Sequence, residues 1–120
     1  MRRRRILVVE DESSAATALV LHLRGQGYTT LGPASTAEEA LSLALSENPD
    51  LILMDVGLSG PMDGVETAWA IRAQTGVGII FMTALPAQIV SSRIWGLKAL
   101  GLIEKPFDLD DITDLIDRLP

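Results

Sequence analysis

The chain has 120 residues, which fits one domain of ordinary size, and 48% of them are hydrophobic, so a sizeable core can form. The absence of cysteine excludes disulfides and thiolate metal sites. The formal net charge of −6 disfavours nonspecific binding to nucleic acid, which requires a basic surface.

A basic run, Arg2–Arg5, precedes the first apolar segment. That segment is too short for a signal peptide, and Glu10-Asp11-Glu12 ends it. No apolar run approaches the roughly 20 residues that span a bilayer, so we expect no membrane contact and, without cysteine, a cytoplasmic location. We expect the arginines to be a solvated lead-in to the first strand, with docking to an acidic partner as the alternative.

Five short apolar runs, each bounded by turn-forming residues, are typical of strands in a parallel sheet. The second run is half polar, which suits a sheet edge, and Gly32-Pro33 is expected to break it. The runs lie at 6–9, 28–31, 51–54, 79–82 and 99–103.

The segments between these runs carry apolar residues at helical spacing. Their start signals are Ser13 or Ser14, the capping-box spacing of residues 35–38, the turn before Gly64, Pro86, and Asp108 with Asp111 three residues on. We expect the third helix to end near Gly76 and the fourth to be the least regular. Five strands alternating with five helices predict an α/β fold with a parallel sheet covered on both faces. No linker or internal repeat is evident, so we expect a single domain over residues 1–120.

Polar side chains follow four of the predicted strands directly. Glu10 and Asp11 follow the first strand, Asp55 the third, Thr83 the fourth and Lys105 the fifth. Ligands of open parallel sheets bind beyond the carboxyl ends of the strands, so these groups are expected to converge.

Clustered carboxylates repel one another, and a bound cation removes that conflict. An all-oxygen ligand set suits Mg²⁺. Magnesium with a lysine is a common clamp for a transferring phosphoryl group, and a carboxylate in such a clamp can itself be the nucleophile. A threonine hydroxyl and a backbone N–H at the end of the fourth strand can bind a phosphoryl oxygen.

Five fragments in this order resemble the landmarks of the response-regulator receiver domain of two-component signalling, and the resemblance covers essentially the whole chain. They are Val8-Val9-Glu10-Asp11-Glu12, Leu53-Met54-Asp55, Met62-Asp63-Gly64, Met82-Thr83-Ala84 and Glu104-Lys105-Pro106-Phe107. The resemblance implies a flavodoxin-like (βα)5 fold, a three-layer sandwich with strand order 2-1-3-4-5.

The resemblance also implies a function. A sensor histidine kinase or a histidine phosphotransfer protein would donate a phosphoryl group to this chain, with Mg²⁺ as cofactor and Mn²⁺ as a substitute. A downstream effector or a second copy would bind the face made by the fourth helix, fifth strand and fifth helix. No direct contact with nucleic acid, no output domain and no enzymatic turnover are expected. The implied roles are phosphoacceptor for Asp55, switch hydroxyl for Thr83, phosphoryl contact for Lys105 through a cis Lys105–Pro106 bond, phosphoryl N–H donor for Ala84, and metal ligands for Glu10, Asp11, Asp55 and the carbonyl of Gly57.

Three features depart from the family pattern. The loop from Asp55 to Asp63 is one residue longer than the commonest form, and Leu102 stands where the family has its switch aromatic. A threonine shift therefore cannot be coupled to an aromatic ring in the usual way. The segment 95–100 replaces the usual small-residue lead into the fifth strand, so a short or displaced fourth helix is expected.

Three other functions are weighed against the signalling switch. A degenerate receiver would dock partners without phosphorylation, and Leu102 favours that alternative. A Mg²⁺-dependent phosphatase of the haloacid-dehalogenase type would need a second Asp where Gly57 stands. A flavodoxin-like cofactor protein would need glycines and hydroxyls, not acids, after the first strand.

Four remaining residues are interpreted as structural. We expect Asp63 to cap a helix and His22 to be solvated. Trp69 and Trp95 are expected in the core, although Trp95 has the better claim to exposure because its helix has the weakest apolar pattern.

Overall fold

Five parallel strands in the order β2-β1-β3-β4-β5 form the sheet of the computed structural model, which describes residues 4–120. The predicted fold class and strand order are confirmed. The strands are β1 (Arg5–Val9), β2 (Thr29–Ala34), β3 (Leu51–Asp55), β4 (Gly78–Thr83) and β5 (Ala99–Glu104). The helices are α1 (Ser13–Gly25), α2 (Ala37–Glu47), α3 (Gly64–Arg72), α4 (Ala87–Ile94) and α5 (Leu109–Asp117).

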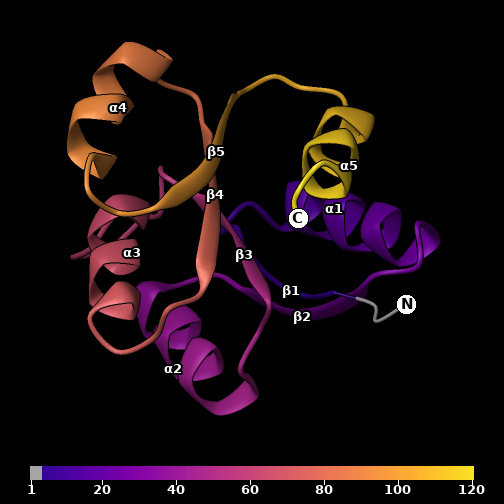
Figure 1. Ribbon diagram of the computed structural model, residues 1–120, viewed down its shortest axis with the longest axis horizontal. Coiled ribbons are helices and arrows are strands. Elements are labelled where there is room, and N and C mark those ends of the chain that lie inside the picture. Colours follow the sequence, from indigo (N-terminus) through magenta and orange to yellow (C-terminus); the bar gives the residue numbers. More distant parts are fainter. Residues whose placement is uncertain (1–3) are drawn as a thin grey trace.

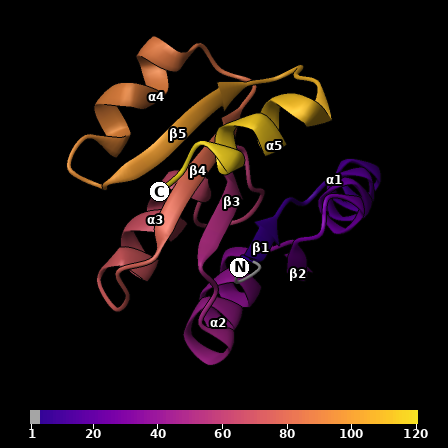
Figure 2. The ribbon, with the colours of Figure 1, turned by 45° about the vertical axis from the view of Figure 1, so that its right-hand side comes forward.

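Helices cover both faces of the sheet. In Figures 1 and 2, α1 and α5 lie on one side, and α2, α3 and α4 lie on the other. Alternate residues of each strand point to opposite faces, so the sheet divides the core into two apolar clusters. On β3, Ile52 and Met54 join the cluster under α2–α4, whereas Leu51 and Leu53 join the cluster under α1 and α5. All four side chains are fully buried, which explains why β3 reads as a continuous apolar run.

The prediction that Gly32-Pro33 breaks the second strand is wrong. β2 continues to Ala34, which pairs with Val9 of β1 after a register shift between Leu7 and Val9. Proline has no N–H to donate, and an edge strand with a local irregularity tolerates that loss. The extra length places the carbonyl of Ala34 2.9 Å from the backbone nitrogen of Glu10, which donates a hydrogen bond to it. β2 therefore supports the backbone of the first acidic residue after β1.

Two helix caps differ from the prediction by one residue. Glu12 precedes α1 and accepts a hydrogen bond from the Ala15 nitrogen, in the role expected of a serine. Thr36 caps α2 through the Glu39 nitrogen, one residue after the predicted capping box. Asp63 caps α3 as predicted. Any neighbouring side chain that carries an oxygen can accept a hydrogen bond from a free N–H at a helix start. The local sequence therefore predicts the capping residue only to within one position.

Two helices end earlier than their apolar patterns suggest. α3 ends at Arg72, not near Gly76. α4 has eight residues, in line with the expected short helix. Its end follows from the backbone, because Trp95 is extended and Gly96 has φ +93°. Leu97 is still buried, so the apolar spacing continues into a segment that is no longer helical.

The basic run at the start of the chain is only partly described, since Arg2 and Arg3 lie outside residues 4–120. Arg4 donates hydrogen bonds to the carbonyls of Leu119 (3.1 Å) and Pro120 (2.8 Å). Arg5 donates to the carbonyl of Asn48 (3.2 Å). Both described arginines therefore bind their own chain. Across the described part of the chain, no helix has the length and apolar character needed to cross a membrane.

Candidate functional site

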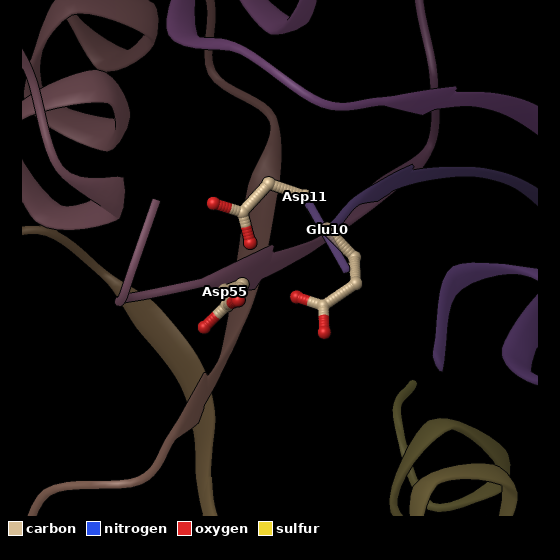
Figure 3. Close-up of side chains that lie close together, drawn as sticks. All are labelled: Glu10, Asp11 and Asp55. Carbon is tan, nitrogen blue, oxygen red and sulfur yellow. The ribbon is translucent and has the colours of Figure 1, made fainter. Parts of the chain in front are cut away.

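Three carboxylates gather at the carboxyl ends of β1 and β3. Glu10 and Asp11 follow β1, Asp55 ends β3, and these strands are neighbours in the sheet. Each side chain offers an oxygen that lies within 4.8 Å of the other two. Figure 3 shows the three carboxylates turned toward a common space. The predicted convergence at this sheet edge is present.

Lys105 joins this cluster from the end of β5. Its Nζ lies 3.2 Å from Oδ1 of Asp55 and 3.3 Å from Oε1 of Glu10. Burial alone would lower the pKa of Lys105, but the charges of Asp55 and Glu10 outweigh it and raise the pKa. Lys105 is therefore a fixed cation beside the carboxylates. The Lys105–Pro106 bond is cis, as the sequence resemblance implied.

Glu10 has an incomplete set of hydrogen bonds and a raised pKa. Its side chain is buried, and Oε2 has no hydrogen-bond partner among the described residues. Burial first, and then the hydrogen bond and charge of Asp55, raise the pKa of Glu10 to about 8, although Lys105 acts in the opposite direction. A buried carboxylate oxygen without a partner costs free energy unless another group binds it.

Asp11 is held by a residue that the sequence did not single out. The backbone nitrogen and the hydroxyl of Ser59 donate to Oδ2 of Asp11 at 2.9 and 2.8 Å. The hydroxyl hydrogen bond is the main cause that lowers the pKa of Asp11. The only signal in the sequence was the extra residue in the loop that carries Ser59, and that signal did not indicate a contact with Asp11.

Thr83 lies fully buried at the end of β4. Its Oγ1 accepts a hydrogen bond from the backbone nitrogen of Leu85 at 2.8 Å and lies 3.3 Å from the carbonyl of the same residue. Ala84, between them, is exposed on the cavity wall. The hydroxyl therefore holds the start of the β4–α4 loop, and Thr83 lines the same cavity as the acidic cluster.

Gly57 lies in the loop directly after Asp55. Its backbone nitrogen donates to Oδ1 of Asp55 at 3.0 Å, so this loop folds back on the carboxylate. Oδ1 of Asp55 thus interacts with both Gly57 and Lys105. Gly64 packs against the same strand end: a Cβ at this position would lie 1.9 Å from the carbonyl oxygen of Asp55.

A cavity of about 800 Å³ opens at this sheet edge. Its polar lining includes the acids and Lys105, and its apolar wall comes from α1, the end of β4 and the segment after Lys105. The predicted residues on the wall are Glu10, Asp11, Asp55, Gly57, Thr83, Ala84 and Lys105. All seven predicted site residues therefore border one space.

The donor set fits a hard divalent cation. All of its side-chain ligands are carboxylate oxygens, and Oε2 of Glu10 has no hydrogen-bond partner among the described residues, so it is available to a ligand. Mg²⁺ prefers oxygen ligands and usually binds one or two carboxylates while keeping several waters. Glu10, Asp11 and Asp55 can hold such an ion.

Comparison with known proteins decides the family. The family model of the response regulator receiver domain matches residues 6–117. The chain belongs to this family. It is 32% identical over 114 residues to the transcriptional regulatory protein PdtaR of Mycobacterium tuberculosis, covering 95% of this chain and 55% of that protein. It is also 40% identical over 82 residues to the DNA-binding response regulator MtrA of Mycolicibacterium paratuberculosis, covering 68% of this chain and 36% of that protein. This receiver therefore spans about half or less of the length of these relatives.

Solved receivers have the same fold. The signal receiver domain of a modulated diguanylate cyclase from Desulfovibrio desulfuricans has a TM-score of 0.87 at 34% identity, covering 97% of this chain and 92% of that chain. Vibrio cholerae chemotaxis protein CheY4 has a TM-score of 0.88 at 24% identity, covering 99% of this chain and 100% of that chain. The second likeness shows the fold alone. The family match identifies this chain as a receiver of two-component signalling.

Leu102 occupies the β5 position at which the sequence resemblance places the switch aromatic of the family. Leu102 is half-buried on β5 and pairs with the fully buried Phe81 of β4. A polar contact joins the start of α4 to the end of β5. Oε1 of Glu104 accepts a hydrogen bond from the Ala87 nitrogen at 2.7 Å. This contact was not foreseen, because it depends on the path of the β4–α4 loop.

Three structural expectations are wrong. His22 is not simply solvated: its Nε2 lies 3.3 Å from Oγ1 of Thr113 and 3.4 Å from Oδ1 of Asp110, so it joins α1 to α5. Trp69 is 44% exposed and packs along the surface, with its Nε1 donating to the carbonyl of Arg93 at 3.1 Å. Trp95 is 86% exposed, so its expected place in the core is wrong as well, although it is the more exposed of the two tryptophans, as its weak apolar pattern indicated.

Proposed function

We propose that this receiver accepts a phosphoryl group on Asp55 with the help of Mg²⁺. The observation that carries the proposal is the convergence of the Asp55 carboxylate with Lys105 and the acidic pair Glu10 and Asp11. The donor would be the phosphohistidine of a sensor histidine kinase or of a histidine phosphotransfer protein, since the family belongs to two-component signalling.

The chemistry follows from the groups around Asp55. A carboxylate oxygen of Asp55 attacks phosphorus, the P–N bond to the donor imidazole breaks, and an aspartyl phosphate remains. A Mg²⁺ ion held by Glu10, Asp11, Asp55 and the Gly57 carbonyl would neutralise charge on the phosphoryl oxygens. Lys105, whose Nζ lies 3.2 Å from Oδ1 of Asp55, supplies a second positive charge.

Thr83 and Ala84 would bind the phosphoryl group after transfer. The Thr83 hydroxyl would exchange its present contact with Leu85 for a phosphoryl oxygen, and the Ala84 N–H would donate to another oxygen. Because Thr83 now holds the start of the β4–α4 loop, this exchange would release the loop. The signal would then reach the face made by α4, β5 and α5, which a downstream effector or a second copy would bind. Ile89 and Leu100 on this face are exposed, which suits an interaction surface.

The experiment is phosphorylation by a small phosphodonor. Wild-type protein incubated with acetyl phosphate and MgCl₂ is expected to gain one phosphoryl group that is stable in acid and labile in base. Asp55→Asn is expected to gain none, and Asp114→Asn, an exposed aspartate on α5, is expected to behave as wild type. Intact-protein mass spectrometry measures the product.

The result separates this function from a docking module that works without phosphorylation, which Leu102 makes a real alternative. Absence of a labile phosphate on wild type, at millimolar Mg²⁺, contradicts the proposal and favours the docking module. If wild type and Asp55→Asn gain the same amount of labile phosphate, the assignment of Asp55 as the phosphoacceptor is contradicted. Either outcome is read only after circular dichroism shows that the variants are folded.

A further inference from the structure

The longer loop after Asp55 reaches back to the acidic cluster across 48 positions of sequence. Ser59, near the middle of this loop, donates to Asp11 through both its backbone nitrogen and its hydroxyl. The two bonds, at 2.9 and 2.8 Å, end on the same oxygen, Oδ2. The loop thus holds one of the three carboxylates in one orientation.

The loop is fixed on both sides of Ser59. Leu58 is 5% exposed and packs in the core cluster under α2–α4, and Gly60 turns the chain with φ +105°, a conformation that glycine adopts without strain. At the base of the loop, the Val56 nitrogen donates to the carbonyl of Met82 at 2.9 Å. The positions of the two Ser59 donors are therefore set by contacts of the loop with the rest of the fold and do not depend on the acidic cluster.

Asp11 needs this support more than its neighbours do. Glu10 and Asp55 are buried and both contact Lys105, whereas Asp11 is half-buried at the rim of the cavity. A short carboxylate at a rim can rotate away from the other two. Two hydrogen bonds to a charged oxygen are strong enough to hold one rotamer. Figure 3 shows that this rotamer directs an Asp11 oxygen toward the space shared with Glu10 and Asp55.

We infer that Ser59 is a positioning residue for the metal site of this receiver: it clamps Oδ2 of Asp11 so that the carboxylate presents an oxygen to the cation beside Glu10 and Asp55. The inference rests on the proposed function, because it assumes that the acidic cluster binds Mg²⁺. The inference also gives the one-residue lengthening of the loop a structural role, because the longer loop places Ser59 within reach of Asp11. Partners behind metal ligands generally strengthen metal binding by fixing ligand orientation.

The test is Mg²⁺ affinity, measured by titrating MgCl₂ into the protein and following the amide resonance of Gly57 by NMR. We expect Ser59→Ala to raise the Mg²⁺ dissociation constant about tenfold, because the hydroxyl donor is lost and the backbone donor remains. Ser59→Thr keeps the hydroxyl and is expected to restore the wild-type value. Both substituted proteins are expected to stay folded without metal, as circular dichroism would show, since Ser59 is exposed.

The matched control is Ser35→Ala. Ser35 is also an exposed serine whose hydroxyl donates to a carboxylate, Oε1 of Glu39, at 2.9 Å, and its hydroxyl is not part of the hydrogen bonds that the described residues make to Glu10, Asp11 or Asp55. Its Mg²⁺ affinity should equal that of wild type. A Ser59→Ala protein that binds Mg²⁺ as tightly as wild type, or more tightly, overturns the role of Ser59, and tighter binding would mean that the loop competes with the ion. Failure of wild type itself to bind Mg²⁺ overturns the proposed metal site and the inference together, whereas the first outcome leaves the proposed function standing.

Discussion

At the residue scale, one aspartate outside the acidic cluster links two helices. Asp63 accepts a hydrogen bond from the Glu66 nitrogen at 3.0 Å as the cap of α3, and its Oδ2 lies 2.7 Å from Nη1 of Arg93 in α4. Burial pushes the pKa of Asp63 upward most strongly, but the hydrogen bonds from Arg93 and Glu66 and the charge of Arg93 outweigh it. The pKa of Asp63 is therefore lowered, and its charged form stabilises the fold.

This pair predicts a pH dependence. A carboxylate with a lowered folded pKa contributes stability above its unfolded pKa and loses it as the pH falls through the folded pKa. Arg93→Gln is expected to raise the pKa of Asp63, measured by NMR titration of its carboxyl carbon. It should cost about 0.2 to 1 kcal/mol of unfolding free energy at pH 7, because the pair is part-exposed and screened. That difference should shrink as the pH falls below the ordinary range of an aspartate and through the lowered pKa of Asp63. An Asp63 pKa that is the same in Arg93→Gln and wild type would contradict the link; Arg118→Gln, at the exposed end of α5, is the control.

At the element scale, the start of α3 is packed directly against the end of β3. The Gly64 nitrogen donates to the carbonyl of Val56 at 2.9 Å, which closes the loop that carries Gly57 and Ser59. A Cβ on Gly64 would lie 1.9 Å from the Asp55 carbonyl oxygen and 2.8 Å from the Val56 Cα. Backbone atoms cannot move aside as a flexible side chain can, so this position requires glycine although its φ is not positive.

Gly64→Ala is accordingly expected to destabilise the protein by about 3 kcal/mol or more, because overpacking against backbone forces the strand and the helix apart. Urea unfolding followed by circular dichroism measures the change. Gly25→Ala is the matched control: Gly25 ends α1, and an added Cβ there meets nothing within 4 Å. A Gly64→Ala protein as stable as the Gly25→Ala protein would show that the loop relaxes without cost.

At the scale of the whole molecule, the site joins parts of the chain that only the folded sheet brings together. Glu10, Asp55 and Lys105 lie at the ends of three different strands, and the folded sheet brings Lys105 into contact with both carboxylates. An ion that binds the folded cluster and not the unfolded chain stabilises the fold by mass action.

We therefore expect Mg²⁺ to raise the unfolding free energy by about 2.7 kcal/mol at a free concentration 100 times its dissociation constant. Thermal or urea unfolding in chelator and in MgCl₂ measures this gain. Glu10→Gln removes a ligand and is expected to lose most of it, while its metal-free form keeps its fold because glutamine matches the protonated acid in shape. An equal gain from Mg²⁺ in wild type and Glu10→Gln would place the ion elsewhere.

The sequence by itself determined the strands, their approximate ends and the chemical groups at the sheet edge. Continuous apolar runs such as Leu51–Met54 indicate buried strands because such residues have few other stable environments. Groups that directly follow a strand, such as Asp55 and Thr83, must lie at its carboxyl end in a parallel sheet. These inferences use only local pattern and one rule of topology, so the fold and the members of the site could be predicted.

Only the tertiary structure decided the contacts between distant segments. The clamp of Ser59 on Asp11 depends on the three-dimensional path of a loop whose length the sequence shows but whose shape it does not. The position of Lys105 between Glu10 and Asp55 depends on the order and twist of three strands. The exposure of Trp69 and the contact of His22 with α5 depend on how helices pack, and the continuation of β2 through Pro33 depends on its place at the sheet edge. Each of these is set by the sum of many weak contacts across the fold, which no short stretch of sequence encodes.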